Sequence, residues 1–194
     1  MDGLIPLVNE VSCCEICKPF LSLGPRPIIQ VAESAKILII GQAPGAKVHA
    51  SGIPFDDASG DRLRSWMGVD TSTFYDASKI AIMPMGFCYP GKGKSGDLPP
   101  RSECAPQWHS KILAELPNIK ITLLVGQYAQ KYYLKNRHNS LTETVIHWHT
   151  LLPEFFPLPH PSPRNRIWMK KNPWFEKEAV PALRQLVSKA LFMP

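Results

Sequence analysis

Two short loops carry residue types that can do chemistry together. His160–Asn165 reads His-Pro-Ser-Pro-Arg-Asn and follows the apolar run Phe155–Leu158. Gly41–Gly45 reads Gly-Gln-Ala-Pro-Gly and follows the apolar run Ile37–Ile40. The carboxyl ends of parallel strands lie on one edge of an α/β sheet, and ligands bind there. We therefore expect the two loops to meet at one site, where the imidazole of His160 can donate or accept a proton near neutral pH.

The Gly41–Gly45 loop is a tight turn that exposes backbone amides above the sheet. It is not a phosphate-binding P-loop, because no Gly-Lys-Ser/Thr follows it. A purely structural turn explains these five residues equally well. The next segment, Ser51–Gly60, adds chemistry, because it places Phe55 beside two carboxylates, Asp56 and Asp57, between glycines.

These three side chains suit a site that binds a planar ligand and activates water. The ring of Phe55 can stack on an unstacked nucleobase. Asp57 can position water near a cationic transition state, as hydrolysis of a glycosidic bond requires. The alternatives are core packing for Phe55, and helix capping or solvation in a loop for Asp56 and Asp57. The residues by themselves leave both interpretations open.

The His160 loop is stiffened by the prolines on both sides of Ser162, so the imidazole is preorganised. A neutral imidazole that donates a hydrogen bond to a leaving group stabilises the negative charge on that group. The alternative is an ordinary surface histidine, since the chain has 6 histidines.

Cations follow the loop, with Arg166, Lys170 and Lys171 interleaved with Trp168 and Trp174. Clustered cations beside flat aromatic rings suit phosphate neutralisation and base stacking. A solvated helix entry has the same appearance. A second cationic stretch, 92–95, is interpreted as a flexible surface loop that could touch the other strand of a duplex.

The cysteines have the spacing of a metal site that is split along the chain. Cys14 and Cys17 are two residues apart and can hold a metal from one turn. Cys88 and Cys104 are far from each other, which suits a zinc ribbon poorly, whereas an iron–sulfur cluster tolerates ligands from separate loops. Free thiols in a reducing compartment remain the alternative.

Composition restricts the class of protein. The chain has 194 residues, enough for one well-buried domain, and a net charge of +6 that suits a polyanionic partner. No apolar run approaches the length of a membrane span, and the N-terminus lacks a signal-peptide layout. We therefore expect a cytoplasmic protein with reduced cysteines and no membrane partner.

The apolar pattern predicts a single α/β domain over 1–194. Strands are expected at 36–40, 80–85, 119–125 and 155–158, and 144–148 is a further candidate. Helices are expected at 61–67, 108–116, 126–135 and from Asn172-Pro173 to about Phe192, with a break or kink at Pro181. Residues 1–34 are expected to be irregular. This alternation predicts a three-layer α/β/α sandwich around a mainly parallel sheet of about four strands.

Three segments together resemble the active-site motifs of the uracil-DNA glycosylase superfamily: Gly41–Gly45, the Gly-x-Pro-Phe-x-Asp-Ala-Ser-Gly stretch at 52–60, and His160–Asn165. The nearest branches are the iron–sulfur-containing families four and five. Many members carry Asp or Asn where this chain has Ala43, and the iron–sulfur branches share the alanine. In the family-five pattern, the water-handling carboxylate is at the position of Asp57.

The chain also departs from these patterns. Gln42 replaces a Glu of family four. The position of an Asn that reads the uracil edge in several branches matches Pro84, which cannot do so. Family five also lacks that Asn and accepts several deaminated bases. Strict selectivity for uracil is therefore not expected.

The resemblance implies roles for further residues. A base pocket would be formed by Gly41, Gln42, Ala43, Pro44, Gly45, Phe55 and His160. The loop with Pro163 would enter the minor groove, where Arg164 fills the gap, Ser162 and Asn165 contact phosphates, and Lys170 adds charge. Cys14, Cys17, Cys88 and Cys104 would hold a structural 4Fe–4S cluster, with Cys13 as the spare.

The implied function is a monofunctional, monomeric DNA glycosylase of base-excision repair. It would hydrolyse the N-glycosidic bond of uracil or another deaminated base in single- or double-stranded DNA, with Asp57 and His160 as catalytic residues. One alternative is a catalytically weak or inactive DNA-binding protein on the same scaffold, since Ala43 and Pro84 replace polar residues. A second is a hydrolase of small nucleosides or glycosides.

Overall fold

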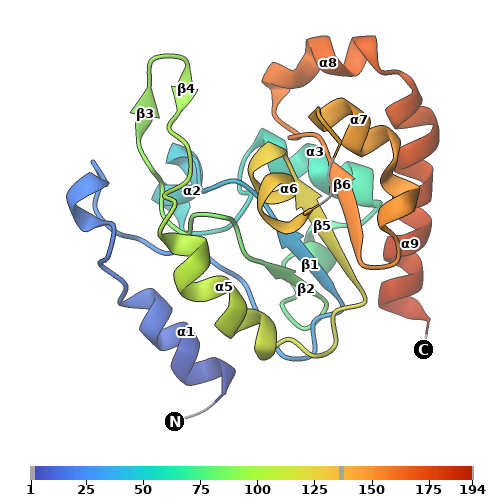
Figure 1. The fold of residues 1–194 in the computed structure, drawn as a ribbon. Helices are drawn as coiled ribbons and strands as arrows, with labels where there is room; N and C mark the ends of the chain where they lie inside the picture. The colour runs from blue at the N-terminus through green and yellow to red at the C-terminus, as the bar shows by residue number, and fades with distance from the viewer. Residues whose placement is uncertain (1–2, 136–137, 194) are drawn as a thin grey trace.

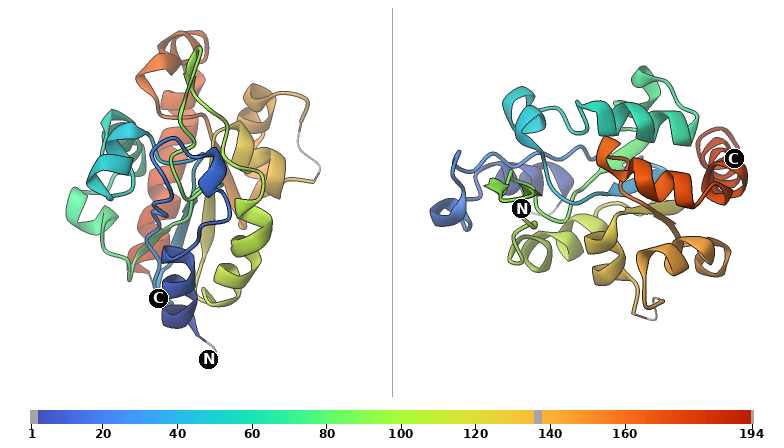
Figure 2. Two further views of the ribbon diagram at one scale, coloured as in Figure 1. Left: turned by 90° about the vertical axis from the view of Figure 1, so that its left-hand side faces the viewer. Right: turned by 90° about the horizontal axis from the view of Figure 1, so that it is seen from above.

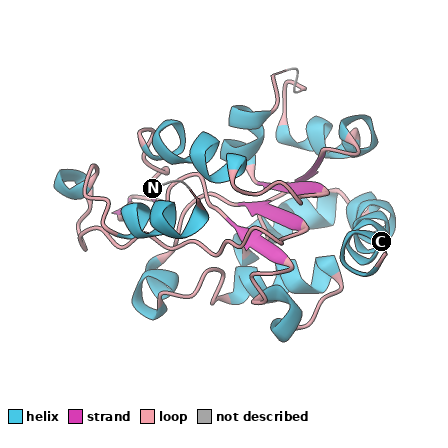
Figure 3. Ribbon diagram, turned by 90° about the horizontal axis from the view of Figure 1, so that it is seen from below, coloured by secondary structure: helices cyan, strands magenta, loops and turns pink. Residues whose placement is uncertain are grey.

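The computed structural model, in which residues 3–135 and 138–193 are described, is built around a four-stranded sheet (Figure 1). The strand order is β2-β1-β5-β6, and all three neighbouring pairs are parallel. The strands are β1 (Ile37–Ile40), β2 (Ile80–Ile82), β5 (Ile121–Val125) and β6 (Phe155–Leu158). Helices cover both faces, so the predicted α/β/α sandwich with a parallel sheet is confirmed (Figure 3).

The sheet is buried on both faces because its strands are almost wholly apolar. Successive side chains of β1 enter two different cores: Ile37 and Ile39 belong to one, Leu38 and Ile40 to the other. The first core is completed by α3 (Ala58–Met67) and α9 (Val180–Phe192). The second is completed by α1 (Leu4–Ser12), α5 (Cys104–Ala114) and α6 (Gln127–Tyr133).

Short elements connect these layers around the sheet (Figure 2). The remaining helices are α2 (Ala46–Ser51), α4 (Thr71–Phe74), α7 (Leu141–Ile146) and α8 (Arg166–Lys171), with 3-10 turns at Lys18–Phe20, Trp148–Leu151 and Pro163–Asn165. A small antiparallel hairpin pairs β3 (Lys92–Gly93) with β4 (Gly96–Asp97). Among the described residues, no helix has the length and apolarity that crossing a bilayer requires.

Two of the predicted elements are wrong. Residues 1–34 are not irregular throughout, because α1 lies within them and packs Leu4 and Val11 into the second core. Residues 144–148 are not a strand: they fall in α7 and the turn after it. The β-branched composition suggested a strand, but Ser140 caps the helix by accepting a hydrogen bond from the Glu143 amide at 3.1 Å.

The predicted strand 80–85 is shorter than expected because Pro84 has no amide hydrogen. The chain nevertheless continues beside the end of β1. The amides of Met83 and Met85 donate to the carbonyls of Ile39 and Gly41, both at 2.9 Å. This pairing carries Pro84 to the edge of the sheet where the β1 loop begins.

The last helical segment begins after Pro173, as predicted, but it starts with a π-helical turn at Phe175–Ala179. The turn precedes Pro181, whose ring is incompatible with regular helix geometry at the carbonyl four residues earlier. The side chain of Asn172 does not cap this helix, since its Oδ1 accepts from the indole of Trp174 at 3.2 Å.

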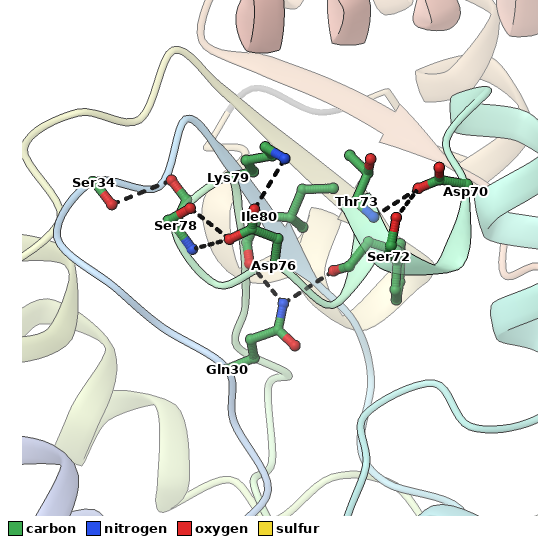
Figure 4. A network of polar contacts seen from close by, with 10 residues as sticks. Gln30, Ser34, Asp70, Ser72, Thr73, Asp76, Ser78, Lys79 and Ile80 are labelled. Atoms are coloured by element: carbon green, nitrogen blue, oxygen red, sulfur yellow. Dashed lines mark hydrogen bonds and ion pairs between the residues drawn. The ribbon is translucent and has the colours of Figure 1, made fainter.

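A polar network fixes the start of β2 from below (Figure 4). The side-chain amide of Gln30 donates to the carbonyls of Phe74 at 3.0 Å and Ile80 at 2.8 Å. Asp76 accepts from the Ser78 amide at 3.0 Å and pairs with Lys79 at 3.0 Å. These contacts join α4 to β2 and set the register of the edge strand.

Candidate active site

A slot of about 470 Å³ opens at the carboxyl edge of the sheet, and it collects most of the predicted site residues. Its walls come from the loops after β1 and β6, the start of α3, and the β3–β4 hairpin. The predicted residues that line it are Gly41, Gln42, Ala43, Pro44, Gly45, Phe55, Asp57, His160, Ser162, Arg164 and Asn165. The expected convergence of the two loops therefore occurs.

Phe55 forms one wall of the slot and is held there by two glycines. Its backbone φ is 55°, a left-handed value that residues other than glycine rarely adopt. A Cβ on Gly41 would lie 3.1 Å from the Phe55 ring, and a Cβ on Gly60 would lie 1.8 Å from the Phe55 carbonyl oxygen. The ring packs edge-on against Phe74 at 6.2 Å. Phe55 thus both touches the core and presents its ring to the slot.

Asp57 performs the helix-capping role and also lines the slot. Its Oδ1 accepts from the amides of Ser59 at 2.9 Å and Gly60 at 3.0 Å, at the N-terminus of α3. These bonds fix the carboxylate and leave Oδ2 for a ligand or a water molecule. Asp56 is exposed and does not line the slot, so the geometry favours Asp57 over Asp56.

His160 is held in one tautomer by its own loop. Nδ1 accepts from the Ser162 amide at 3.2 Å, so the proton of the neutral ring resides on Nε2. The side chain of Asn165 donates to the His160 carbonyl at 2.8 Å, and Gly126 leaves room for the ring. Burial lowers the pKa of His160, although Asp57 and Asp97 act in the opposite direction. The ring is therefore a neutral hydrogen-bond donor at neutral pH.

Arginines support the rim of the slot. Arg62 donates to the Ser162 carbonyl at 3.2 Å, and the Ser162 hydroxyl accepts from the Arg164 amide at 3.2 Å. Arg164 reaches across to the hairpin, where it donates to the Ser95 carbonyl at 3.5 Å. Pro163 and Lys170 are exposed and lie outside the lining of the slot.

The tryptophans downstream do not form an exposed stacking surface, which was one of the two interpretations that the sequence left open. Trp168 and Trp174 are half-buried and pack edge-on against Phe175 at 5.6 and 6.1 Å. The indole of Trp168 donates to the Thr142 hydroxyl at 2.8 Å. Their apolar area is used to anchor α8 to the first core, which leaves the cations of α8 facing outward.

The sequence interpretation missed Asp97. Residues 92–95 were read as a flexible surface loop, but they belong to the β3–β4 hairpin, which forms one wall of the slot. The Tyr89 hydroxyl donates to Asp97 Oδ1 at 3.3 Å. The signal available in the sequence was the two-residue turn Lys94-Ser95 between Gly93 and Gly96, which is a hairpin pattern.

Pro84 lies in the wall of the slot, and its carbonyl oxygen already accepts a hydrogen bond from a buried side chain. His109, which is buried, donates from Nε2 to this carbonyl at 3.1 Å and accepts at Nδ1 from the Tyr133 hydroxyl at 2.6 Å. Burial lowers the pKa of His109 to about 4. Pro84 therefore offers the slot an apolar ring edge and no amide donor.

Four cysteines line a second, smaller cavity, as the sequence predicted. Cys14, Cys17, Cys88 and Cys104 all contribute, whereas Cys13 is exposed and outside it. Burial raises the pKa of Cys88 to about 11 and that of Cys104 to about 12. The four sulfurs are free thiols.

Two observations bear on whether these thiols suit an iron–sulfur cluster. Within the described residues, no three His, Cys, Asp or Glu side chains form a group that could hold a metal ion. An iron–sulfur cluster takes its four thiolates on different iron atoms, so its ligands can come from separate segments that surround one cavity. The Phe87 amide donates to Cys104 Sγ at 3.3 Å. Arg101 Nε, on the wall, is buried without a hydrogen-bond partner among the described residues, so it is available to a sulfide.

The fold and the slot define an α/β protein with an open cavity at the carboxyl edge of a four-stranded parallel sheet, the edge at which such folds bind ligands. The family model of the uracil DNA glycosylase superfamily matches residues 29–184. The chain belongs to this superfamily, as the three motifs implied.

One curated relative agrees with this assignment, and one solved structure shares the fold. The chain is 25% identical over 132 residues to the type-4 uracil-DNA glycosylase of Sulfurisphaera tokodaii, an alignment that covers 68% of this chain and 58% of that protein. The chain therefore spans less than two thirds of the length of this curated relative. Its fold is similar to the solution NMR structure of a candidate uracil DNA glycosylase from Methanosarcina acetivorans, with a TM-score of 0.51, 17% identity, and coverage of 83% of this chain and 97% of that one.

Proposed function

We propose that the protein is a monofunctional DNA glycosylase that releases uracil or another deaminated base from DNA. The observation that carries the proposal is the shared slot, in which an aromatic ring, a fixed carboxylate and a neutral imidazole donor face the same space. These three groups meet the needs of glycosidic hydrolysis: a surface for the base, a carboxylate for water, and a donor for the leaving group.

The reaction follows from their positions. The extruded base stacks on Phe55, and the C1′–N bond breaks with its electron pair going to the base. Nε2–H of His160 stabilises the negative charge on the departing base. Oδ2 of Asp57 positions water, whose oxygen bonds to C1′ while its proton passes to the carboxylate. No lysine is among the residues that line the described slot, so Schiff-base chemistry and strand cleavage are not expected.

DNA is the proposed partner. The net charge of +6 favours a polyanion, and the rim presents Ser162, Arg164 and Asn165 where a strand would enter. In this proposal Ser162 and Asn165 contact phosphates, the exposed Pro163 leads the loop into the groove, and Arg164 fills the space left by the base. Lys170 adds charge beside the rim. Extrusion is easiest for a mispaired base, which biases the enzyme toward damage.

The base need not be uracil alone. The wall at Pro84 has no amide that could read one edge of the ring. The side-chain amides that line the slot are those of Gln42 and Asn165, and the Asn165 amide already donates to the His160 carbonyl. A base edge that faces Pro84 therefore meets no side-chain donor, and this wall discriminates weakly between deaminated bases. We include broader specificity in the proposal.

We also propose that Cys14, Cys17, Cys88 and Cys104 hold a 4Fe–4S cluster. The cluster would crosslink the chain, because its ligands come from the segment after α1, the loop after β2 and the start of α5. Its role in this proposal is structural: it ties the N-terminal arm to the segment that carries Pro84.

The test is base release from single-stranded oligonucleotides that each contain one damaged base. Uracil release by the wild type that falls at least about 100-fold in both Asp57→Asn and His160→Ala would support the mechanism. Asp56→Asn is the matched control, because this neighbouring carboxylate is outside the slot. Undiminished activity in both slot variants would refute the assigned roles. Wild-type activity that is insensitive to salt would favour a hydrolase of small nucleosides.

A further inference from the structure

The slot contains a carboxylate that neither catalytic loop supplies. Asp97 reaches it from β4, whereas Asp57 reaches it from the start of α3. Oδ1 of Asp97 accepts from the Tyr89 hydroxyl at 3.3 Å, which leaves Oδ2 unused. This second oxygen faces the β1 loop: a Cβ built on Gly45 would lie 3.6 Å from it.

The surrounding residues fix the position of the Asp97 carboxylate. Gly96 has φ 140°, and the Arg164 guanidinium packs directly against its Cα. This contact holds the hairpin to the His160 loop. Tyr89 is buried, with its ring 6.0 Å from that of His49, so its hydroxyl is a fixed donor. The carboxylate is therefore directed at the slot by groups that are themselves held in place.

The charge of Asp97 is unusual for the mouth of a DNA site. Among the described residues, no cation lies within ion-pair distance of its carboxylate. The neighbouring side chains Lys92, Lys94 and Arg164 are cationic and suit phosphates. A carboxylate here opposes phosphate binding, so it lowers affinity for the ground state. It becomes favourable only when positive charge develops nearby.

We propose that Asp97 is a second catalytic carboxylate, which stabilises the positive charge that develops on the deoxyribose as the C1′–N bond breaks. The inference rests on the proposed glycosylase function and deepens it. Asp97 takes no proton and forms no bond. It acts through its charge, whose effect increases once the bound nucleotide excludes water from the mouth of the slot. Tyr89 is a positioning residue for it.

The experiment compares Asp97→Asn with the wild type, using single-turnover release of uracil and binding to an unmodified oligonucleotide of equal length. We expect kcat to fall about 10- to 100-fold, less than for a fully buried electrostatic group because Asp97 is exposed in the free protein. We expect DNA binding to be unchanged or tighter, since a negative charge has been removed. Tyr89→Phe should give a smaller loss of kcat.

The matched control is Glu33→Gln, which removes one exposed carboxylate outside the slot and reports the effect of net charge alone. A pH profile adds an independent readout. Asp97 and Asp57 both raise the pKa of His160 against its burial. The cations beside the loop are Arg164, which belongs to it, and Arg62, which donates to the Ser162 carbonyl from α3. Asp97→Asn should therefore move the acid limb of kcat to lower pH.

The outcomes separate the inference from the proposed function. A fall in kcat with retained DNA binding and an acid limb at lower pH supports Asp97 as a catalytic carboxylate. Equal kcat in Asp97→Asn and Glu33→Gln, in an active wild type, overturns this inference alone. A parallel loss of kcat and DNA affinity also overturns it, because it marks a structural or DNA-contacting role. A wild type that releases no base from any oligonucleotide overturns both.

Discussion

Asp57 combines a structural and a chemical role, and substitution can separate them. Its Oδ1 caps α3 through two amide hydrogen bonds, at 2.9 and 3.0 Å. Asparagine caps helices about as well as aspartate, because its carbonyl oxygen accepts the same bonds. Asp57→Asn should therefore keep the fold and lose the base that takes a proton from water. Asp57→Ala should lose both functions.

The magnitudes follow from the two roles. Loss of a side-chain cap costs about 1 kcal/mol of unfolding free energy. For a chain of this size, that lowers the melting temperature by about 2–4 °C. Loss of a general base costs about 10²- to 10⁴-fold in kcat. We expect Asp57→Asn to melt within about 1 °C of the wild type and Asp57→Ala to melt about 2–4 °C lower, with both equally slow.

Thermal unfolding and single-turnover uracil release on the same preparations test this. Asp70 provides the matched control, since it caps α4 by accepting from the Thr73 amide at 2.7 Å and does not line the slot. Asp70→Ala should show the stability loss without the kinetic loss. Wild-type kcat in Asp57→Asn, or equal melting temperatures for its Asn and Ala variants, would refute the reasoning.

Three further predictions concern other parts of the molecule. The pKa of His109 is about 4 in the folded protein against an ordinary 6.5. The unfolded chain therefore binds the proton first as pH falls from 6.5 to 4, so this group lowers the free energy of unfolding by up to about 3 kcal/mol over that range. Urea unfolding at pH 7 and pH 4 should show this loss in the wild type and a smaller one in His109→Leu. Cys104→Ser should lose iron, measured by chemical analysis after anaerobic purification, while Cys13→Ser keeps it; iron-free wild type would contradict the cluster. Lys170→Ala should reduce the slope of log affinity against log salt by about 1, and an unchanged slope would exclude a contact between Lys170 and a phosphate.

The sequence alone predicted the structure correctly where a polar turn follows an apolar strand. Ile37–Ile40 and Phe155–Leu158 were predicted as strands, and their parallel pairing with β5 brings Gln42 and His160 to the same edge of the sheet. The capping role of Asp57 was one of the alternatives considered, and the structure shows that it coexists with a place in the slot.

The sequence alone could not predict the structure where tertiary contacts decide between two local conformations or between a buried and an exposed side chain. Thr144 belongs to a β-branched stretch, yet the cap at Ser140 makes it helical, and the Thr144 hydroxyl donates to the Ser140 carbonyl at 2.9 Å. Trp168 follows cationic residues on the chain, but its indole finds an acceptor at Thr142 and turns inward. Asp97 joins the slot only because the hairpin folds over Gly45, a contact that sequence spacing does not encode.

One short segment, 83–88, links the two cavities. Pro84 lines the slot, while Phe87 and Cys88 line the cavity of the four cysteines. His109 contacts both ends of the segment, because it donates to the Pro84 carbonyl at 3.1 Å and stacks on the Phe87 ring at 5.6 Å. The segment is therefore a wall that both cavities share, and one buried histidine contacts each end of it. We expect a group bound by the cysteines to restrain Pro84 as well, because only three residues separate Pro84 from Cys88.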